Sequence, residues 1–166
     1  MNTHRKLAAT LLPGLFFAAC GGCAVTVAPL DPGEELAIVA EKRDRLIANL
    51  AHVDAQQGLF GAIESRARAR WKLVPAPAPN EIIVRLDKLD LRASREKEVV
   101  LAMTATMLWK DKDDPRPIMK SYEYLGPAAP LEYWIDNRDG FIARAFERGY
   151  ARIADDLVGD LEGKSR

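Results

Sequence analysis

Three successive segments between residues 81 and 125 carry the two-residue apolar periodicity of β-strands. This run constrains the fold more than any other feature of the chain. Prolines at positions 75, 77 and 79 precede it and predict an extended, polyproline-like connector that ends a helical region before the sheet begins. A run of strands placed between two helical regions predicts an α+β layer fold.

The first two segments differ in their expected burial. Residues 81–91 place Ile82, Val84 and Leu86 on one face. The apolar phase then shifts, which predicts a β-bulge near positions 87 and 88. Residues 99–109 are apolar on both faces. This pattern predicts a central strand that is covered on both sides or along most of its length.

The third segment, residues 117–125, carries Ile118, Tyr122 and Tyr124 on one face, with Lys120 between them. An acidic loop at residues 110–115 joins it to the segment before it. The loop lacks the glycine and the distal glutamate of an EF-hand. We therefore expect a polar hairpin loop and no calcium site.

A helical region is expected on the amino-terminal side of the sheet. Pro32 opens it, with acidic residues in the first turn and apolar residues at spacings of three and four. The stripe consists of Leu36, Val39, Leu46, Ile47, Leu50 and Val53. Gly58 and Gly61 disfavour helix, so we expect a break or kink there and a second amphipathic piece over residues 59–67.

A second helix is expected to close the chain. Asp136 or Asn137 is expected to cap it, with Asp139 in its first turn. Gly149 is unfavourable inside a helix, and we expect it to permit close approach of the helix to the sheet. The apolar stripe consists of Ile142, Ala145, Phe146, Ile153, Leu157 and Leu161.

Together these patterns predict an α+β fold with an antiparallel or mixed sheet of three to five strands and two main helical regions packed on it. We expect a single domain over residues 34–161, followed by a short tail at residues 162–166. A chain of 166 residues that is 48% hydrophobic is long enough to bury such a core.

Residues 1–19 have the composition of a secretory signal peptide. Arg5 and Lys6 precede the uncharged, mostly apolar residues 7–19, which are too few to span a bilayer and are interrupted by Pro13. No later segment approaches about eighteen consecutive apolar residues, so we expect no second membrane span.

The apolar run leads into Phe-Ala-Ala-Cys-Gly at residues 17–21. This stretch resembles the lipobox, the cleavage signal of bacterial lipoproteins. The resemblance implies cleavage before Cys20, a thioether-linked diacylglycerol on that cysteine, and acylation of its amino group. Cys23, which follows two glycines, is the alternative acylation site. Because Gly21 stands where inner-membrane lipoproteins carry Asp, the resemblance points to the outer membrane.

Acylation at Cys20 makes residues 20–33 a lipidated tether that anchors the chain to the membrane. Within it, residues 24–30 are β-branched and short. They form either a first strand or only the connection to the lipid. Cys20 and Cys23 also form a C-x-x-C pair, but a zinc or redox site needs a second pair of ligands or a thioredoxin-like context. With two cysteines and two histidines in the chain, we expect no metal site and no cofactor.

The charge balance argues against a nucleic-acid partner. Lysine and arginine number 24, and aspartate and glutamate also number 24, so the formal net charge is zero. Arg66, Arg68 and Arg70 form the one basic run that stands out, and on a helix only Arg66 and Arg70 share a face. We expect a solvated helix face at this run.

Several segments of the carboxy-terminal half carry a family resemblance. They are the core strand at residues 99–109, the Ser-Tyr-Glu-Tyr-Leu-Gly-Pro stretch at 121–127, the Leu-Glu-Tyr-Trp stretch at 131–134, and the closing helix at 141–161. Through these four segments, residues 82–161 resemble small periplasm-facing bacterial lipoproteins. This group includes the auxiliary lipoproteins of ABC-type lipid-trafficking systems and the lipopolysaccharide-assembly lipoprotein. The resemblance implies a location and an architecture.

Signatures of catalysis are missing from the sequence. It has no G-x-S-x-G elbow, P-loop, G-x-G-x-x-G or H-E-x-x-H pattern. A serine–histidine triad would need His52, which we expect at a surface or boundary position on the first helix. Asp155 and Asp156 are adjacent on a helix and project about 100° apart, so they make a poor acid–base pair. We therefore expect a protein that is not an enzyme.

These observations favour a periplasm-facing lipoprotein that serves as a non-enzymatic accessory or structural component of an envelope complex, with lipid or lipopolysaccharide trafficking as the candidate process. Its expected partners are the membrane, through the acyl chains, and an envelope protein. We expect an exposed apolar partner surface at Tyr122, Tyr124, Tyr133 and Trp134. The alternative is an envelope small-molecule binder or hydrolase with an unrecognised site.

The substitution Cys20→Ser is expected to abolish lipid attachment and to leave Cys23 intact, because the thioether forms only on the cysteine that follows the cleavage signal. Intact mass of the membrane-extracted protein measures this directly. An unprocessed or unlipidated wild-type chain contradicts the lipoprotein prediction.

Overall fold

The computed structural model describes residues 29–41, 55–93, 98–112, 114 and 116–163. The strands are β1 (Glu35–Ala40), β2 (Lys72–Leu73), β3 (Asn80–Ala93), β4 (Glu98–Lys110), β5 (Ile118–Leu125) and β6 (Ala129–Pro130). The helices are α1 (Ala55–Ala67), α2 (Leu131–Asp136) and α3 (Phe141–Leu161), with a 3₁₀ turn at Arg138–Gly140 before α3.

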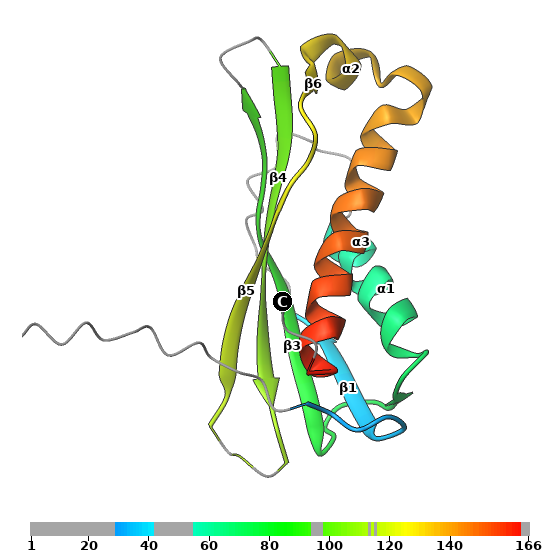
Figure 1. Cartoon of the computed structure of the whole chain (residues 1–166), viewed down its shortest axis with the longest axis vertical. Coiled ribbons are helices and arrows are strands. Elements are labelled where there is room, and N and C mark those ends of the chain that lie inside the picture. Colours follow the sequence, from blue (N-terminus) through cyan, green and yellow to red (C-terminus); the bar gives the residue numbers. More distant parts are fainter. Residues whose placement is uncertain (1–28, 42–54, 94–97, 113, 115, 164–166) are drawn as a thin grey trace, which may run out of the picture.

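The described strands form a mixed sheet in the order β2-β1-β3-β4-β5, with the short β6 also pairing with β4. β1 runs parallel to β2 and β3, whereas β3, β4 and β5 are antiparallel neighbours. Helices α1 and α3 lie side by side on one face of this sheet (Figure 1). The predicted α+β class, with its mixed sheet and two main helical regions, is confirmed.

The three predicted strand segments correspond to β3, β4 and β5. The register of β3 on β4 shifts between Leu86 and Lys88, which confirms the predicted bulge. β4 is an interior strand of the sheet, with β3 hydrogen-bonded along one side and β5 along the other. Its odd-numbered residues from Leu101 to Trp109 are buried under the helices, whereas Thr104, Thr106 and Leu108 on the other face are only half-buried. The two described long helices therefore cover one face of β4, whereas its other face, which includes the buried Ala102, is only partly covered in the described part of the chain. The strand is buried or half-buried along most of its length, which was the alternative expected.

The prediction of a helix beginning at Pro32 is wrong. Residues Glu35–Ala40 form strand β1, whose backbone pairs with β2 and β3 on its two sides. Leu36 and Ala37 are both fully buried. A short apolar run with both faces buried has no periodicity that separates strand from helix, so pairing with β3 decided its conformation. The later residues of the predicted stripe, from Leu46 to Val53, lie outside the described residues.

The connector at residues 74–79 is not the extended polyproline segment that was predicted. It bends at residues 76, 77 and 79, and the Ala76–Pro77 peptide bond is cis. The reason is topological, because Leu73 and Asn80 both pair with Leu36 from opposite sides of β1. Two strand spacings are about 10 Å, whereas six residues of polyproline would span about 19 Å. The chain must therefore fold back to enter β3.

The expected break at Gly58 and Gly61 is also wrong, since α1 runs unbroken through both glycines. A Cβ at Gly58 would overlap Tyr150 Cε2 and lie 2.9 Å from Tyr150 Cζ, whereas a Cβ at Gly61 would meet nothing within 4 Å. Gly58 therefore lets α1 approach α3 closely, and this contact maintains the helix where local propensity opposes it.

Close approach of α3 to the sheet at Gly149 is confirmed. A Cβ there would lie 2.6 Å from Met103 Sδ and 3.0 Å from Tyr124 Cδ1. The predicted apolar stripe of α3 is buried from Ala145 to Leu161, with Ile142 half-buried. The predicted cap is wrong, because Gly140 in the left-handed conformation is the N-cap residue and Asp139 lies in the 3₁₀ turn before the helix. Asn137 still contributes from further upstream, since its Oδ1 accepts the backbone N–H of Ile142 at 3.0 Å.

Both ends of the described chain meet at the carboxyl end of α3. The backbone N–H of Leu30 donates to the Leu161 carbonyl at 2.7 Å, and Trp71 Nε1 donates to the Leu30 carbonyl at 3.4 Å. Leu30 itself is buried in the core. Residues 29 and 30, which belong to the predicted tether, are thus tied to the domain and do not form a strand. The rest of the possible first strand, residues 24–28, lies outside the described residues.

The two glycines of α1 predict opposite effects of alanine. Gly61→Ala is expected to stabilise the fold by about 1 kcal/mol, because it removes the backbone entropy cost of glycine in an open position. Gly58→Ala is expected to destabilise it by about 1–3 kcal/mol through overlap with the Tyr150 ring. Urea unfolding of both variants measures the free energies, and equal shifts in one direction would show that α1 and α3 are not in close contact at Gly58.

Candidate functional site

The structure separates the four residues of the predicted partner surface. Tyr122 and Tyr124 lie on β5 and face the helices, whereas Tyr133 and Trp134 lie on α2. Tyr122 and Trp134 are each only 6% exposed, and Tyr124 is half-buried. The expectation of an exposed surface is therefore wrong for Tyr122 and Trp134, because both side chains fill the layer between sheet and helices. Tyr133 is 37% exposed.

Trp134 anchors α2 to the rest of the fold. Its Nε1 donates to the Val99 carbonyl at 3.3 Å, and its ring meets Phe141 edge-on with centroids 5.0 Å apart. The ring of Tyr133 also meets Phe141 edge-on, with centroids 5.5 Å apart. These contacts hold a six-residue helix that is too short to be stable by itself.

The outer side of α2 is apolar and exposed. Leu131 is 51% exposed and Ile135 is 72% exposed, and the two are spaced by four residues on one side of the helix. We call the side chains of Leu131 and Ile135 the apolar tip. The signal for it was present in the sequence as a short apolar patch after the turn at residues 126–130, but only the anchoring of Trp134 shows which side chains point outward.

A hollow of about 160 Å³ lies beside Trp134. Its apolar lining comes from Leu101, Trp134, Phe141 and Ala145, and Gly126 and Pro127 contribute to its wall. Arg144 and Arg148 of α3 also line it, and both side chains are exposed. We call this feature the Trp134 hollow. Sequence reasoning missed both arginines, since a cation on the exposed side of an amphipathic helix carries no distinguishing pattern.

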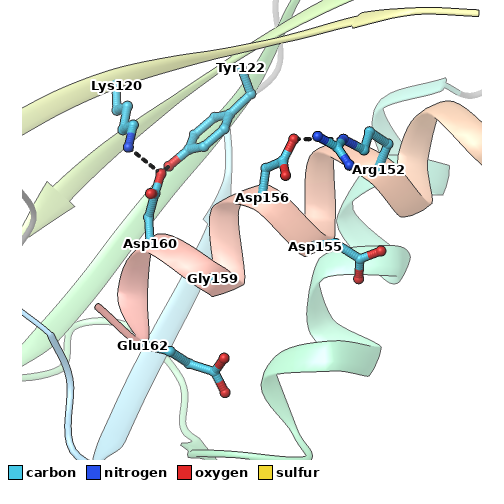
Figure 2. A pocket seen from close by; sticks show the side chains of 8 residues that line it. All are labelled: Lys120, Tyr122, Arg152, Asp155, Asp156, Gly159, Asp160 and Glu162. Atoms are coloured by element: carbon cyan, nitrogen blue, oxygen red, sulfur yellow. Dashed lines mark hydrogen bonds and ion pairs between the residues drawn. The ribbon is translucent and has the colours of Figure 1, made fainter. Parts of the chain in front are cut away.

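A larger pocket, of about 530 Å³, lies at the other end of α3 and is lined by polar side chains (Figure 2). Asp160 is buried there. It accepts a hydrogen bond from the Tyr122 hydroxyl at 2.8 Å and pairs with Lys120 Nζ at 2.6 Å. Figure 2 shows Lys120 and Tyr122 converging on Asp160 from β5, so this group ties the last strand of the sheet to the end of α3.

The other acidic groups of this pocket are each engaged by a different cation. Asp156 pairs with Arg152 at 2.9 Å, Asp155 pairs with Arg66 of α1, and Glu162 pairs with Arg70 at 2.6 Å. Asp155 and Glu162 project away from Asp160 (Figure 2). The carboxylates therefore do not converge on one point, which is what a metal or a general acid–base pair would require.

The environment of Tyr122 controls what this group can do chemically. Burial, followed by the hydrogen bond to Asp160, raises the pKa of the Tyr122 phenol well above its ordinary value of 10.0. The phenol thus stays protonated near neutral pH and acts as a hydrogen-bond donor. A protonated phenol and a carboxylate that is already paired make a structural tie between β5 and α3, with no activated nucleophile in it.

Two sets of residues that the sequence singled out as possible functional residues remain to be placed. Cys20, Cys23 and His52 lie outside the described residues. Arg66, Arg68 and Arg70 pair with Asp155, Glu64 and Glu162, so the basic run is neutralised at the end of α1 and just beyond it. Among the described residues, no group of three histidine, cysteine or acidic side chains is placed to hold a metal ion, and no helix is long and apolar enough to cross a membrane.

The raised pKa of Tyr122 predicts a loss of stability in alkali. Its contribution is fully present below pH 10 and falls as the pH rises above that value, because the unfolded chain ionises a phenol that the folded chain keeps protonated. Tyr122→Phe is expected to flatten this part of the profile and to cost about 1–3 kcal/mol at neutral pH, since Asp160 loses a donor. Urea unfolding between pH 8 and 11 measures both effects. Tyr133→Phe is the exposed control, and an unchanged alkaline slope in Tyr122→Phe contradicts the assignment.

Comparison with known proteins identifies the fold through structure alone. No protein-family model matches the sequence, and no curated protein matches it. The structure is similar to a DUF330 protein from Xanthomonas campestris, with a TM-score of 0.57, 11% identity, and coverage of 79% of this chain and 84% of that one. It is also similar to a hypothetical protein from Chlamydia trachomatis, with a TM-score of 0.55, 12% identity, and coverage of 80% and 97%.

A minor lipoprotein from Acinetobacter baumannii matches at a TM-score of 0.47 and 9% identity, over 78% of this chain and 92% of that one. At such identities a structural likeness shows the fold and does not transfer an activity. The chain therefore shares its α+β architecture with the Xanthomonas and Chlamydia proteins, over 84% and 97% of their lengths.

Proposed function

We propose that this chain is a lipid-anchored protein of the bacterial envelope that is acylated at Cys20, faces the periplasm from the outer membrane, and binds an envelope protein through its apolar tip. In this role it is a non-enzymatic accessory or structural component. The resemblance of residues 82–161 to lipoproteins of lipid-trafficking and lipopolysaccharide-assembly systems favours a complex in one of those processes.

The observation that carries this proposal is that the apolar tip and the point of chain entry lie at opposite ends of the domain. α3 begins beside α2 and ends beside Leu30, and its 21 residues separate the two by about 30 Å. The described chain thus enters at one end of the long axis, while the apolar tip lies at the other (Figure 1). A chain anchored at Cys20 would present the tip on the side of the domain away from its anchor.

The length of the tether supports the same arrangement. Pro29 is nine positions after Cys20, and this length of chain reaches at most about 30 Å when fully extended. Leu30 is fixed against the end of α3, so the point at which the tether joins the domain is defined. The anchor would therefore keep the carboxyl end of α3 near the membrane and leave α2 accessible from the periplasm.

The tip itself has the chemistry of an interface. Leu131 and Ile135 are large apolar side chains exposed to water on a helix that Trp134 anchors to the domain. Exposed apolar side chains gathered on a rigid element mark interaction surfaces more often than isolated ones do. Because aromatic packing already holds the tip in place, little conformational entropy would be lost when a partner binds it.

An envelope small-molecule binder or hydrolase is the second candidate. The pocket at Asp160 favours it, since about 530 Å³ lies within the size range of small-molecule sites. Its paired carboxylates and its protonated Tyr122 weigh against chemistry there. A small molecule that raises the melting temperature of the wild type, and fails to do so in Lys120→Met, would favour this candidate.

The tip is tested by a photo-crosslinking residue placed at position 135 in living cells, with position 119 as the control. Met119 is 64% exposed on β5, so it matches Ile135 in exposure at a different site. We expect a defined protein adduct from position 135 only. The double substitution Leu131→Ser and Ile135→Ser is expected to weaken that partner at least tenfold, the usual cost of removing central apolar contacts.

Fractionation separates anchoring from binding in the same experiment. Cys20→Ser is expected to release the protein from the outer membrane, whereas Cys23→Ser is the matched control that keeps it there. Adducts that form equally from positions 135 and 119 would show that the tip is not the partner surface.

A further inference from the structure

The Trp134 hollow combines a small apolar cavity with two cations. Its apolar lining joins three elements, with Leu101 from β4, Trp134 from α2, and Phe141 and Ala145 from α3. Trp134 and Leu101 are buried and held by packing, so these walls are preformed. The volume of about 160 Å³ is roughly half that of the smallest usual small-molecule sites. It suits one apolar side chain better than a whole ligand.

The two arginines of the hollow differ from the other cations whose side chains the structure describes. Every other such lysine or arginine lies within ion-pair distance of a carboxylate. Neither Arg144 nor Arg148 has such a partner among the described residues. Arg144 instead donates to the backbone carbonyl of Asp139, which orients its guanidinium without neutralising it.

The spacing of these two arginines brings their positive charges close enough to repel each other. Arg144 and Arg148 are four residues apart on α3, so they share a face of the helix and repel each other. Their two positive charges stand at an apolar cavity. An acidic group bound there would relieve the repulsion and form charge-assisted, bidentate hydrogen bonds of the kind that arginine makes with carboxylates.

We propose that the Trp134 hollow receives one apolar side chain of a partner protein segment, and that Arg144 and Arg148 pair with an aspartate or glutamate next to that side chain. This inference rests on the proposed function and specifies the chemistry of the partner. The apolar residue is the anchor, and the two arginines select segments in which an acidic residue lies within about two positions of it.

The test uses a random-peptide phage library selected against the full-length protein in mild detergent. The wild type is expected to enrich peptides with Leu, Ile, Met or Phe within two positions of Asp or Glu. The double substitution Arg144→Glu and Arg148→Glu is expected to exchange the acidic position for Lys or Arg. Arg68→Glu is the matched charge control, since Arg68 is exposed and lies away from the hollow, beyond the end of α1.

A synthetic copy of the most enriched peptide then tests both parts of the site. We expect Arg148→Glu to weaken its binding at least tenfold and Arg68→Glu to change it less than twofold, as measured by fluorescence anisotropy. Serine in place of the anchor residue of the peptide is expected to cause a loss of similar size. Thermal unfolding checks that the variants fold, which is expected because both arginines are exposed.

Three outcomes would overturn the inference. The first is a selection that enriches no motif, or the same motif in the wild type and in the charge-reversed protein. The second is binding to vesicles of phosphatidylglycerol that requires both arginines while peptides fail, which would assign the hollow to an anionic lipid. The third is self-association that the charge reversal abolishes, which would assign it to a second copy of the chain. If these peptides fail while the adduct from position 135 persists, the proposed function stands and only the chemistry assigned to the hollow is wrong.

Discussion

The packing of α3 against the sheet and against α1 is the contact on which the rest of the structure depends. It is made at two glycines, because Gly149 admits Met103 and Tyr124 while Gly58 admits the ring of Tyr150. No side chain larger than hydrogen fits at either point without displacing buried groups. The close approach buries the apolar stripe of α3 and fixes where its two ends lie.

The two ends of α3 then acquire different properties. At the amino end, Trp134 and Phe141 meet edge-on and hold α2 with its apolar tip in water. At the carboxyl end, Leu161 receives the backbone of Leu30 and Asp160 receives Tyr122 and Lys120. One helix therefore links the point of chain entry to the exposed apolar surface, and this arrangement suits a protein that is anchored at one end and binds at the other.

The charged groups of α3 divide along the same axis. Near the carboxyl end, cations and carboxylates pair off around Asp160, so the larger pocket is polar but electrostatically satisfied. Near the amino end, Arg144 and Arg148 stand at a small apolar hollow without a carboxylate partner among the described residues. Volume alone would favour the larger pocket, whereas unsatisfied charge favours the smaller one. Recognition depends on interactions that a site has left to make, and the smaller hollow has more of them.

Several features follow from local sequence alone, because each rests on apolar periodicity or on a residue with special geometry. They are the strands between residues 80 and 125, the bulge near residue 87, the closing helix and the close approach at Gly149. The amino-terminal apolar run and the cysteine pattern also predict a leader and an anchor. The sequence did not determine β1, because a short apolar run has the same pattern in a buried strand and in a helix until β3 pairs with it. Two further features appear only once the elements pack together. Trp134 turns inward while Leu131 and Ile135 turn outward, and Arg144 and Arg148 meet a hollow made by three elements. Those properties depend on which side of α2 is anchored and on contacts between residues far apart in the chain.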